Sequence, residues 1–441
     1  SPSSTFASSI TDISNTTTTL IATNLTATTY YRAVVTSGTC SVANSTVATI
    51  TVNQVHTITA GANRSVCQNN AMANITMTLG GGATGATVTG LPSGVTSSVA
   101  SGVLTISGTP TVSGQFTYNV TTTGNSCTVA TTSGTITIGV GNNTISYING
   151  TSGTVCAFAD ENNPINFIAP AGNYFNTVNF ASYGRPDGSC GSYTIQSCHS
   201  STSQSKTEEL LLGTNTTSFL ADNTNYGDPC FNVFKRFYGS ASYTQPICQG
   251  TTAPIISGNT PTGNGTYTYS WESSTTGVEG SFSTISGANS QDYSPGILNQ
   301  STFFRRTVTS NGCSSTSTMV LVKVNPRPTS VVSGTTPICN GTSATVSVAL
   351  TGTAPWSLTY SDGTNTTNVS GITASPYTFN VSPTANTTYT VTALNDVNNC
   401  PSIPADRTGN AVISINPRPT AAVSGSTTIC SGESTTISVA F

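Results

Sequence analysis

The chain has 441 residues, enough for about three to five domains of roughly 100–150 residues each. Only 6% of its residues are charged, and 12 Lys+Arg against 15 Asp+Glu give a net charge of −3 with no basic cluster, which excludes a basic nucleic-acid-binding protein. Two histidines and fifteen carboxylates also leave little material for acid–base catalysis, so we expect no enzyme.

Hydrophobic residues make up 35% of the chain and alternate with Thr and Ser, which indicates β-strands rather than disorder. No run of about 18 apolar residues occurs, so no membrane span is expected in this chain. The first residues lack the basic and apolar regions of a signal peptide, and we therefore expect the sequence to be a segment of a longer protein.

Two internal repeats set the expected domain boundaries. The segment NPRPTSVVSGTTPIC, residues 325–339, recurs 91 positions later as NPRPTAAVSGSTTIC, residues 416–430. A second pattern, strand-like alternation followed by a late cysteine, ends at Cys40, Cys313 and Cys400. The repeats predict five β-units and one unlike segment, with boundaries at 1–53, 54–141, 142–246 (the unlike segment), 247–325, 326–416 and 417–441.

Twelve cysteines occur without the spacing of a zinc site, which favours disulfides in an oxidising compartment. Pairing the early and the late cysteine of each β-unit predicts three bridges, with loops of 60 to 65 residues that could each contribute roughly 4 kcal/mol. These bridges are Cys67–Cys127, Cys248–Cys313 and Cys339–Cys400. Cys40 and Cys430 are left over, and we expect their partners outside the chain, with free thiols as the alternative.

The β-units resemble immunoglobulin-like sandwiches, because short Thr/Val/Tyr strands alternate with Gly- and Asn-rich turns and the Cys-to-Cys spans hold Trp271 or Trp356. The fold class expected is mainly β, with tandem sandwiches and one inserted α+β domain that contains a short helix.

The segment 142–246 departs from the repeats and holds eleven of the 27 charged residues. Ser205-Lys-Thr-Glu208, followed by ELLL and Gly213, predicts a helix with a capping box at its start. FASYGRPDGSC (180–190) and NYGDPCFNVFKRF (225–237) resemble the two motifs of the rhamnose/galactose-binding lectin domain of the sea-urchin-egg type. This resemblance implies two bridges, Cys156–Cys190 and Cys198–Cys230.

The resemblance also implies a carbohydrate site, independent of metal and of any cofactor, at Tyr183, Asn223, Asp228 and Lys235. Asp228 would accept from sugar hydroxyls, Lys235 would donate, and Tyr183 would offer a ring face or its hydroxyl. Part of the family pattern is missing, because Ala157 stands where a Glu is expected and Asn232-Val233 replace Gly-Thr. Asp160 and Glu161 are available to replace the missing Glu. A structural alternative is that Asp228 stabilises its own turn by accepting backbone amides.

The flanking repeats resemble those of secreted Bacteroidetes surface proteins, including gliding-motility adhesins exported by the type IX system. The leading hypothesis is a segment of an extracellular cell-surface adhesin whose stiff stalk presents a lectin-like domain to a rhamnose- or galactose-containing polysaccharide. Other copies or repeats of the same chain are further candidate partners. The alternatives are a structural stalk with a degenerate lectin module and, more distantly, the accessory region of a glycan-processing enzyme.

Overall fold

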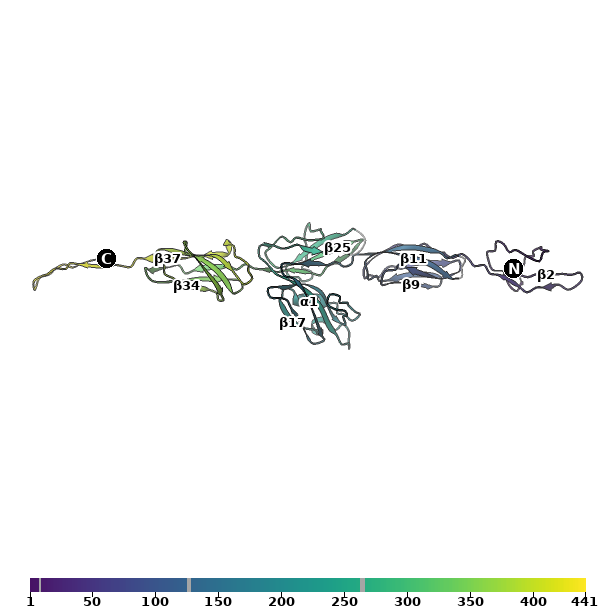
Figure 1. The fold of residues 1–441 in the computed structure, drawn as a ribbon, viewed down its shortest axis with the longest axis horizontal. Helices are drawn as coiled ribbons and strands as arrows, with labels where there is room; N and C mark the ends of the chain where they lie inside the picture. The colour runs from purple at the N-terminus through teal and green to yellow at the C-terminus, as the bar shows by residue number, and fades with distance from the viewer. Residues whose placement is uncertain (8, 125–127, 262–265) are drawn as a thin grey trace.

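The computed structural model describes residues 1–7, 9–124, 128–261 and 266–441, and Figure 1 shows them as an elongated row of β-domains. Three sandwiches follow one another along the long axis, and a further domain lies beside the middle one. The expected fold class, mainly β with one inserted domain that contains a short helix, is confirmed.

The first sandwich (54–141) has strands with one buried face. In β7 (Ile75–Gly80), Ile75, Met77 and Leu79 are buried while the threonines between them are exposed. The other strands are β5 (Thr57–Ile58), β6 (Arg64–Cys67), β8 (Ala83–Thr89), β9 (Val95–Ala100), β10 (Val103–Gly108), β11 (Gly114–Gly124) and β12 (Thr131–Gly139). Two sheets, ordered β5-β7-β10-β9 and β6-β12-β11-β8, enclose the core.

The second sandwich is interrupted in sequence. Its first strand, β13 (Ile145–Tyr147), pairs with β21 (Ile256–Gly258), so residues 142–148 and 247–325 make one domain and residues 149–246 are inserted into it. The boundary expected at residue 142 therefore differs from the observed strand pairing. The remaining strands are β19 (Ile247–Cys248), β20 (Thr251–Thr252), β22 (Thr268–Ser274), β23 (Ser283–Thr284), β24 (Ile297–Leu298), β25 (Thr302–Ser310), β26 (Cys313–Thr316), β27 (Val320–Val322) and β28 (Val324–Asn325).

Two side chains hold the second sandwich together across the insertion. Trp271 is fully buried in a core cluster that includes Ile145 and Tyr147 from before the insertion. The buried Arg306 donates to Asn143 Oδ1 from Nη2 at 2.7 Å and from Nε at 3.0 Å, which ties the segment before β13 to β25.

The third sandwich (326–416) has two complete sheets around Trp356, whose indole nitrogen donates to the carbonyl of Thr351. Its elements are β29 (Ser330–Ser333), β30 (Thr336–Cys339), β31 (Ala344–Leu350), β32 (Trp356–Ser361), β33 (Thr366–Ile372), β34 (Tyr377–Val381), β35 (Thr387–Asn395), the 3-10 turn η1 (Pro404–Asp406), β36 (Arg407–Gly409) and β37 (Ala411–Asn416). The sheet orders are β34-β31-β29-β36 and β30-β37-β35-β32-β33.

The two end segments form short antiparallel pairs. In the first, β1 (Thr29–Tyr31) pairs with β4 (Ala48–Ile50), and β2 (Val34–Val35) pairs with β3 (Ala43–Asn44). In the second, β38 (Ala422–Ser424) pairs with β39 (Ser438–Ala440).

The inserted domain (149–246) has a three-stranded sheet with the order β14-β18-β16, covered by a helix. Its elements are β14 (Gly153–Asp160), β15 (Pro164–Ile168), β16 (Tyr174–Gly184), α1 (Ser203–Leu211), β17 (Thr216–Leu220), α2 (Asn223–Tyr226) and β18 (Arg236–Thr244). The helix α1 begins at Ser203 and its N-cap, Thr202, makes no side-chain cap hydrogen bond, so the capping box predicted at Ser205 is wrong. Glu208 accepts from Gln204 inside the helix instead.

The inserted domain is docked against the second sandwich at its base. Asn149 and Thr244 exchange two hydrogen bonds where the chain enters and leaves the insertion. The buried Tyr174 hydroxyl donates to the carbonyl of Leu321 and accepts from the amide of Lys323, each at 2.9 Å. The insertion is therefore held at a defined side of the row of domains (Figure 1).

The two bridges predicted inside the inserted domain, Cys156–Cys190 and Cys198–Cys230, are confirmed. The bridges predicted inside the sandwiches are wrong, since Cys67 bonds to Cys313 and Cys248 bonds to Cys400. Cys339, like Cys40 and Cys430, is exposed and unbonded among the described residues, and Cys127 lies outside them.

The early and late cysteines of one sandwich lie at opposite ends of it. Cys248 ends a strand beside the exit of the second sandwich, and Cys313 follows β25 at the other end, a strand of nine residues or about 30 Å away. Head-to-tail stacking instead brings each late cysteine to the early cysteine of the preceding sandwich.

Among the described residues, neither helix has the length and the apolar composition that a membrane-spanning helix requires.

Candidate functional site

The four predicted carbohydrate-site residues lie at one edge of the inserted domain's sheet. Because β18 runs antiparallel to both neighbours, its first residue, Arg236, faces Asp160 of β14 and Gly184 of β16. The residues next to these three positions, Lys235, Glu161 and Tyr183, are therefore brought together. Asn223 begins α2 and Asp228 lies in the turn that follows it.

These side chains form one connected polar cluster, which we call the edge cluster: Glu161, Tyr183, Asn223, Asp228 and Lys235. The Tyr183 hydroxyl lies 2.9 Å from Asn223 Oδ1 and 3.2 Å from Glu161 Oε1, and its single proton is shared between these two acceptors. Lys235 Nζ lies 3.3 Å from Glu161 Oε1 and 3.0 Å from Asp228 Oδ1. All four predicted residues thus converge, and Glu161 is the fifth member.

Burial divides the edge cluster into a base and a rim. Tyr183 is fully buried and its ring stacks on Tyr226 at 5.2 Å, and the Lys235 side chain is only 4% exposed. Asn223 is exposed, and the Asp228 side chain is 36% exposed. Tyr183 therefore does not offer a ring face to solvent, and the exposed polar atoms of the cluster belong to Asn223 and Asp228.

The charges of the edge cluster stabilise one another. Burial disfavours charge on Lys235, but the hydrogen bonds and charges of Asp228 and Glu161 raise the pKa of Lys235 above its usual value. Burial likewise opposes ionisation of Glu161, yet hydrogen bonds from Lys235 and Tyr183 lower its pKa. Burial and the nearby Glu161 carboxylate raise the pKa of Tyr183, so its hydroxyl stays protonated and donates.

Asp228 also has the structural role weighed from the sequence. Its Oδ1 accepts from the amide of Cys230 at 3.2 Å, which shapes the turn that the Cys198–Cys230 bridge closes. The side chain thus combines a turn contact, an ion pair with Lys235 and exposure to solvent.

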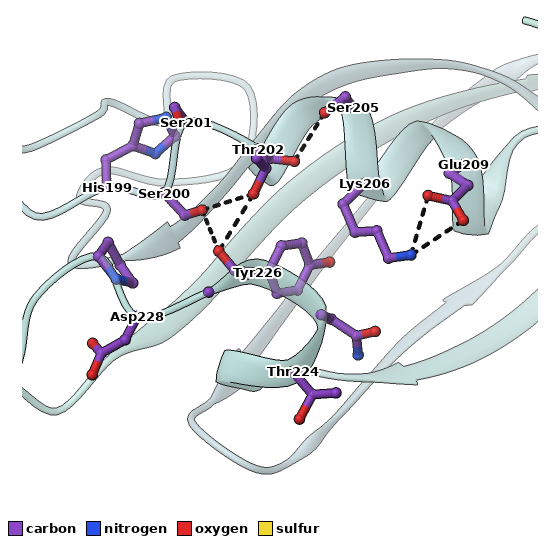
Figure 2. Close-up of a pocket in the computed structure, with 13 residues that line it drawn as sticks. His199, Ser200, Ser201, Thr202, Ser205, Lys206, Glu209, Thr224, Tyr226 and Asp228 are labelled. Atoms are coloured by element: carbon purple, nitrogen blue, oxygen red, sulfur yellow. Dashed lines mark hydrogen bonds and ion pairs between the residues drawn. The ribbon is translucent and has the colours of Figure 1, made fainter. Parts of the chain in front are cut away.

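An open pocket of about 690 Å³ adjoins the edge cluster and is shared only at Asp228 (Figure 2). Figure 2 shows Asp228 and His199 on one side and the Lys206–Glu209 ion pair of α1 on the other. The other lining residues are Ser200, Ser201, Thr202, Ser205, Thr224, Asn225, Tyr226, Gly227 and Pro229. This wall of hydroxyl, amide and charged groups suits a hydrophilic ligand better than an apolar one.

The sequence analysis named one residue of this region only as an alternative and missed two others. Glu161 was identified only as one of two replacements for the Glu missing at Ala157, and its signal is an acidic pair in a chain with few charges. Phe231 and Phe234 were missed, although they are 81% and 59% exposed beside Asp228 and Lys235. Large apolar residues directly after Cys230, next to the Gly-Asp-Pro-Cys motif, are the signal that could have found them.

Two family models match parts of the chain. Residues 169–242 match the model described as the D-galactoside/L-rhamnose binding SUEL lectin domain. The chain carries a lectin domain within an array of β-rich repeats. Residues 2–54 and 237–326 match a second model, described as a domain of unknown function.

Curated relatives are similar over the lectin segment alone. Beta-galactosidase 6 of Oryza sativa subsp. japonica is 36% identical over 64 residues, which are 14% of this chain and 8% of the rice protein. Beta-galactosidase 7 of the same plant is 37% identical over 65 residues, again 14% of this chain and 8% of the rice protein. The chain therefore spans less than a tenth of the length of these relatives. Lectin and immunoglobulin-like domains are themselves non-catalytic kinds of fold.

Similar solved structures include an I-band fragment of titin, with a TM-score of 0.36 and 8% identity, covering 82% of this chain and 99% of that chain. A bacterial ice-binding adhesin has a TM-score of 0.23 and 12% identity, covering 80% of this chain and 94% of that chain.

Proposed function

We propose that the inserted domain binds a galactose- or rhamnose-type carbohydrate at the rim of the edge cluster. The observation that carries this proposal is the convergence of Tyr183, Asn223, Asp228 and Lys235, chosen from positions spread over 53 residues, into one hydrogen-bonded group within a segment that matches a lectin model.

In this proposal the buried members position the exposed ones. Tyr183 occupies the carbonyl oxygen of the Asn223 amide, so the Asn223 amide nitrogen is turned toward the ligand as a donor. Lys235 fixes Asp228 through Oδ1, which leaves Oδ2 to accept from a sugar hydroxyl. A donor and an acceptor held side by side match the adjacent hydroxyls of a pyranose.

The exposed rings of Phe231 and Phe234 add an apolar surface beside the polar groups of the rim. A pyranose has one face of C–H groups, and burying apolar surface on that face contributes roughly 25 cal/mol per Å². Because both rings lie in the loop between Asp228 and Lys235, a sugar held by the rim can contact one of them.

The row of sandwiches supplies the context for this site. We propose an extracellular cell-surface adhesin in which disulfide-linked sandwiches form a stalk and the inserted domain projects from its side. The finer assignment, to secreted Bacteroidetes adhesins of gliding motility, rests on the resemblance of the repeats. Many copies on one surface would raise the avidity of a weak single site.

A second candidate function is a purely structural stalk. Two departures from the family pattern favour it, Ala157 in place of the expected Glu and Asn232-Val233 in place of Gly-Thr. In addition, the polar atoms of Tyr183 and Lys235 are already bonded to Glu161 within the domain. In that case the inserted domain acts as a spacer and binds no sugar.

Calorimetric titration of the whole chain with methyl α-L-rhamnoside and methyl β-D-galactoside distinguishes the two. We expect saturable binding of one sugar by the unmodified chain and its loss in Asn223→Ala and Asp228→Asn. The Tm of the inserted domain should fall only slightly, because Glu161 still accepts from Tyr183 in the first variant and still pairs with Lys235 in the second. Asp187→Asn is the matched control, since Asp187 is an exposed acid of the same domain whose carboxylate accepts from its neighbour Gly188. Absence of saturable binding by the unmodified chain would favour the structural stalk.

A further inference from the structure

Three cysteines occupy the same place in the three sandwiches. Each ends a short strand that pairs in parallel with the last strand of its own sandwich. The register places Cys67 beside Gly139, Cys248 beside Asn325, and Cys339 beside Asn416. All three therefore lie at the end from which the chain leaves the sandwich.

The local hydrogen bonds repeat as well. The amide of Gln249, which follows Cys248, donates to the carbonyl of Asn325 at 2.9 Å, and the amide of Asn340, which follows Cys339, donates to the carbonyl of Asn416 at 3.1 Å. The equivalence of Cys248 and Cys339 thus extends to the backbone around them.

Two of these three cysteines are bonded to the next sandwich. Cys67 bonds to Cys313 of the second sandwich, and Cys248 bonds to Cys400 of the third. Both partners are buried and directly follow a turn, in the sequences Asn-Gly-Cys and Asn-Asn-Cys. Cys339, by contrast, is exposed and unbonded among the described residues.

A separate contact accompanies the disulfide at the junction of the second and third sandwiches. Arg327, in the linker Asn-Pro-Arg-Pro, donates from Nη1 to the carbonyl of Gln249 and pairs through Nε with Asp406 of the third sandwich at 2.7 Å. The same linker recurs at residues 416–419, where Arg418 is exposed and forms no ion pair with any described residue.

We propose that Cys339 and Arg418 form a docking surface for one partner, a further sandwich of the same kind that begins after Asn416. Residues 416–430 repeat residues 325–339, which is the start of such a unit. The partner supplies a buried cysteine at a turn for Cys339 and a carboxylate for Arg418. Each sandwich is then covalently joined to the next along the whole array, which limits bending at every junction.

The covalent step is the oxidation of two thiols to one disulfide. Two sulfur–hydrogen bonds break, one sulfur–sulfur bond forms, and the two protons and two electrons pass to glutathione disulfide, which becomes two molecules of glutathione.

The test uses an extended chain, residues 1–416 followed by a second copy of residues 326–416 that carries Cys339→Ser, so that one Cys339 remains and the Asn-Pro-Arg-Pro linker stays in register. The second copy then offers its own Cys400 and Asp406 to Cys339 and to the linker arginine. After refolding in a glutathione buffer, we expect non-reducing peptide mapping to show a Cys339–Cys400 bridge to the second copy, and maleimide labelling of Cys339, complete in residues 1–441, to be lost.

Controls separate the proposal from general thiol reactivity. The Cys67–Cys313 and Cys248–Cys400 bridges serve as internal references for correct folding. Cys339→Ser in the first copy should leave the Cys400 of the second copy labelled. Arg327→Ala in the second copy, which removes the arginine of the new linker, should slow formation of the new bridge. Labelling of Cys339 that persists while both reference bridges are intact would overturn the proposal, and so would pairing of Cys339 between two chains.

Discussion

Cys67 at the end of β6 is bonded to Cys313 of the following sandwich, across 246 positions of sequence that include the whole inserted domain. Gly139, the last residue of β12, packs so closely on Cys313 that an added Cβ would lie 2.7 Å from the Cys313 sulfur. Val140 and Val308 pack with Cys313 in a small buried cluster. The bridge therefore fixes how one sandwich stacks on the next. It is not an internal staple of an immunoglobulin-like core.

Removing this bridge should loosen the junction without unfolding either sandwich. In the double variant Cys67→Ser, Cys313→Ser, both hydrophobic cores remain intact, so we expect the melting transitions to shift by only a few degrees. The distribution of distances between spin labels on the first and second sandwiches should broaden. A large fall in Tm with an unchanged distance distribution would contradict this role.

The Tyr174 hydroxyl should fix the inserted domain on its carrier. Tyr174→Phe leaves the carbonyl of Leu321 and the amide of Lys323 without their buried partner, at a cost of about 1–3 kcal/mol. Hydrogen exchange should quicken at the amide of Lys323, while the edge cluster and the third sandwich keep their protection. Tyr243→Phe, a half-buried tyrosine of the same domain, is the matched control.

Much of the architecture could be predicted because it depends on local pattern. Alternation of apolar residues with Thr identified the sandwiches, and the two lectin motifs identified the inserted domain, its bridges and four members of the edge cluster. The bridges of the sandwiches could not be predicted, since the spacing of Cys248 and Cys313 does not reveal that the two lie at opposite ends of one domain.

Burial was the other quantity beyond reach of the sequence. Tyr183 and Lys235 were predicted as site residues, and their roles were assigned as if both faced a ligand. In the structure both are buried while Asn223 and Asp228 are exposed. Tyr183 packs in the core of the domain, and Lys235 Nζ pairs with Glu161 and Asp228. The place of β13 in the second sandwich could not be predicted either, because its strand partner, β21, is more than 100 positions away in the sequence.

Lys235 should be essential to the stability of the inserted domain. Lys235→Met removes the only cation that the described structure places against Glu161 and Asp228. The largely buried Glu161 carboxylate then keeps hydrogen bonds from Tyr183 and from the amide of residue 235 but has no countercharge. Loss of one partner of such a pair costs about 3–5 kcal/mol where both are buried, so we expect about 3 kcal/mol here. Urea unfolding followed by hydrogen exchange in β14 and β18 measures this loss.

A second substitution should restore part of that stability. In Lys235→Met, Glu161→Gln the buried negative charge is gone, so the double variant should be more stable than Lys235→Met alone. If the losses of unfolding free energy in Lys235→Met and in Glu161→Gln add up to the loss in the double variant, the interaction between Lys235 and Glu161 does not stabilise the domain.

The buried Glu208 of α1 should make the inserted domain less stable as the pH rises. Burial raises the pKa of Glu208 to about 7, against which the hydrogen bond from Gln204 acts only in part. Between its unfolded pKa near 4.5 and about 7 the folded state holds a proton that the unfolded state has lost, so stability falls with rising pH across this window. This shift of the Glu208 pKa lowers the free energy of unfolding by roughly 3 kcal/mol at pH 8.

Glu208→Gln should remove this pH dependence while keeping the hydrogen-bonding shape of the side chain. We expect its Tm for the inserted domain to exceed that of the unmodified chain at pH 8 and to match it near pH 4.5, where both side chains are neutral. Glu209→Gln is the control on the same helix turn, because Glu209 is 68% exposed and paired with Lys206. Calorimetry between pH 4.5 and pH 8 would contradict the buried-proton account if the two variants showed the same pH dependence.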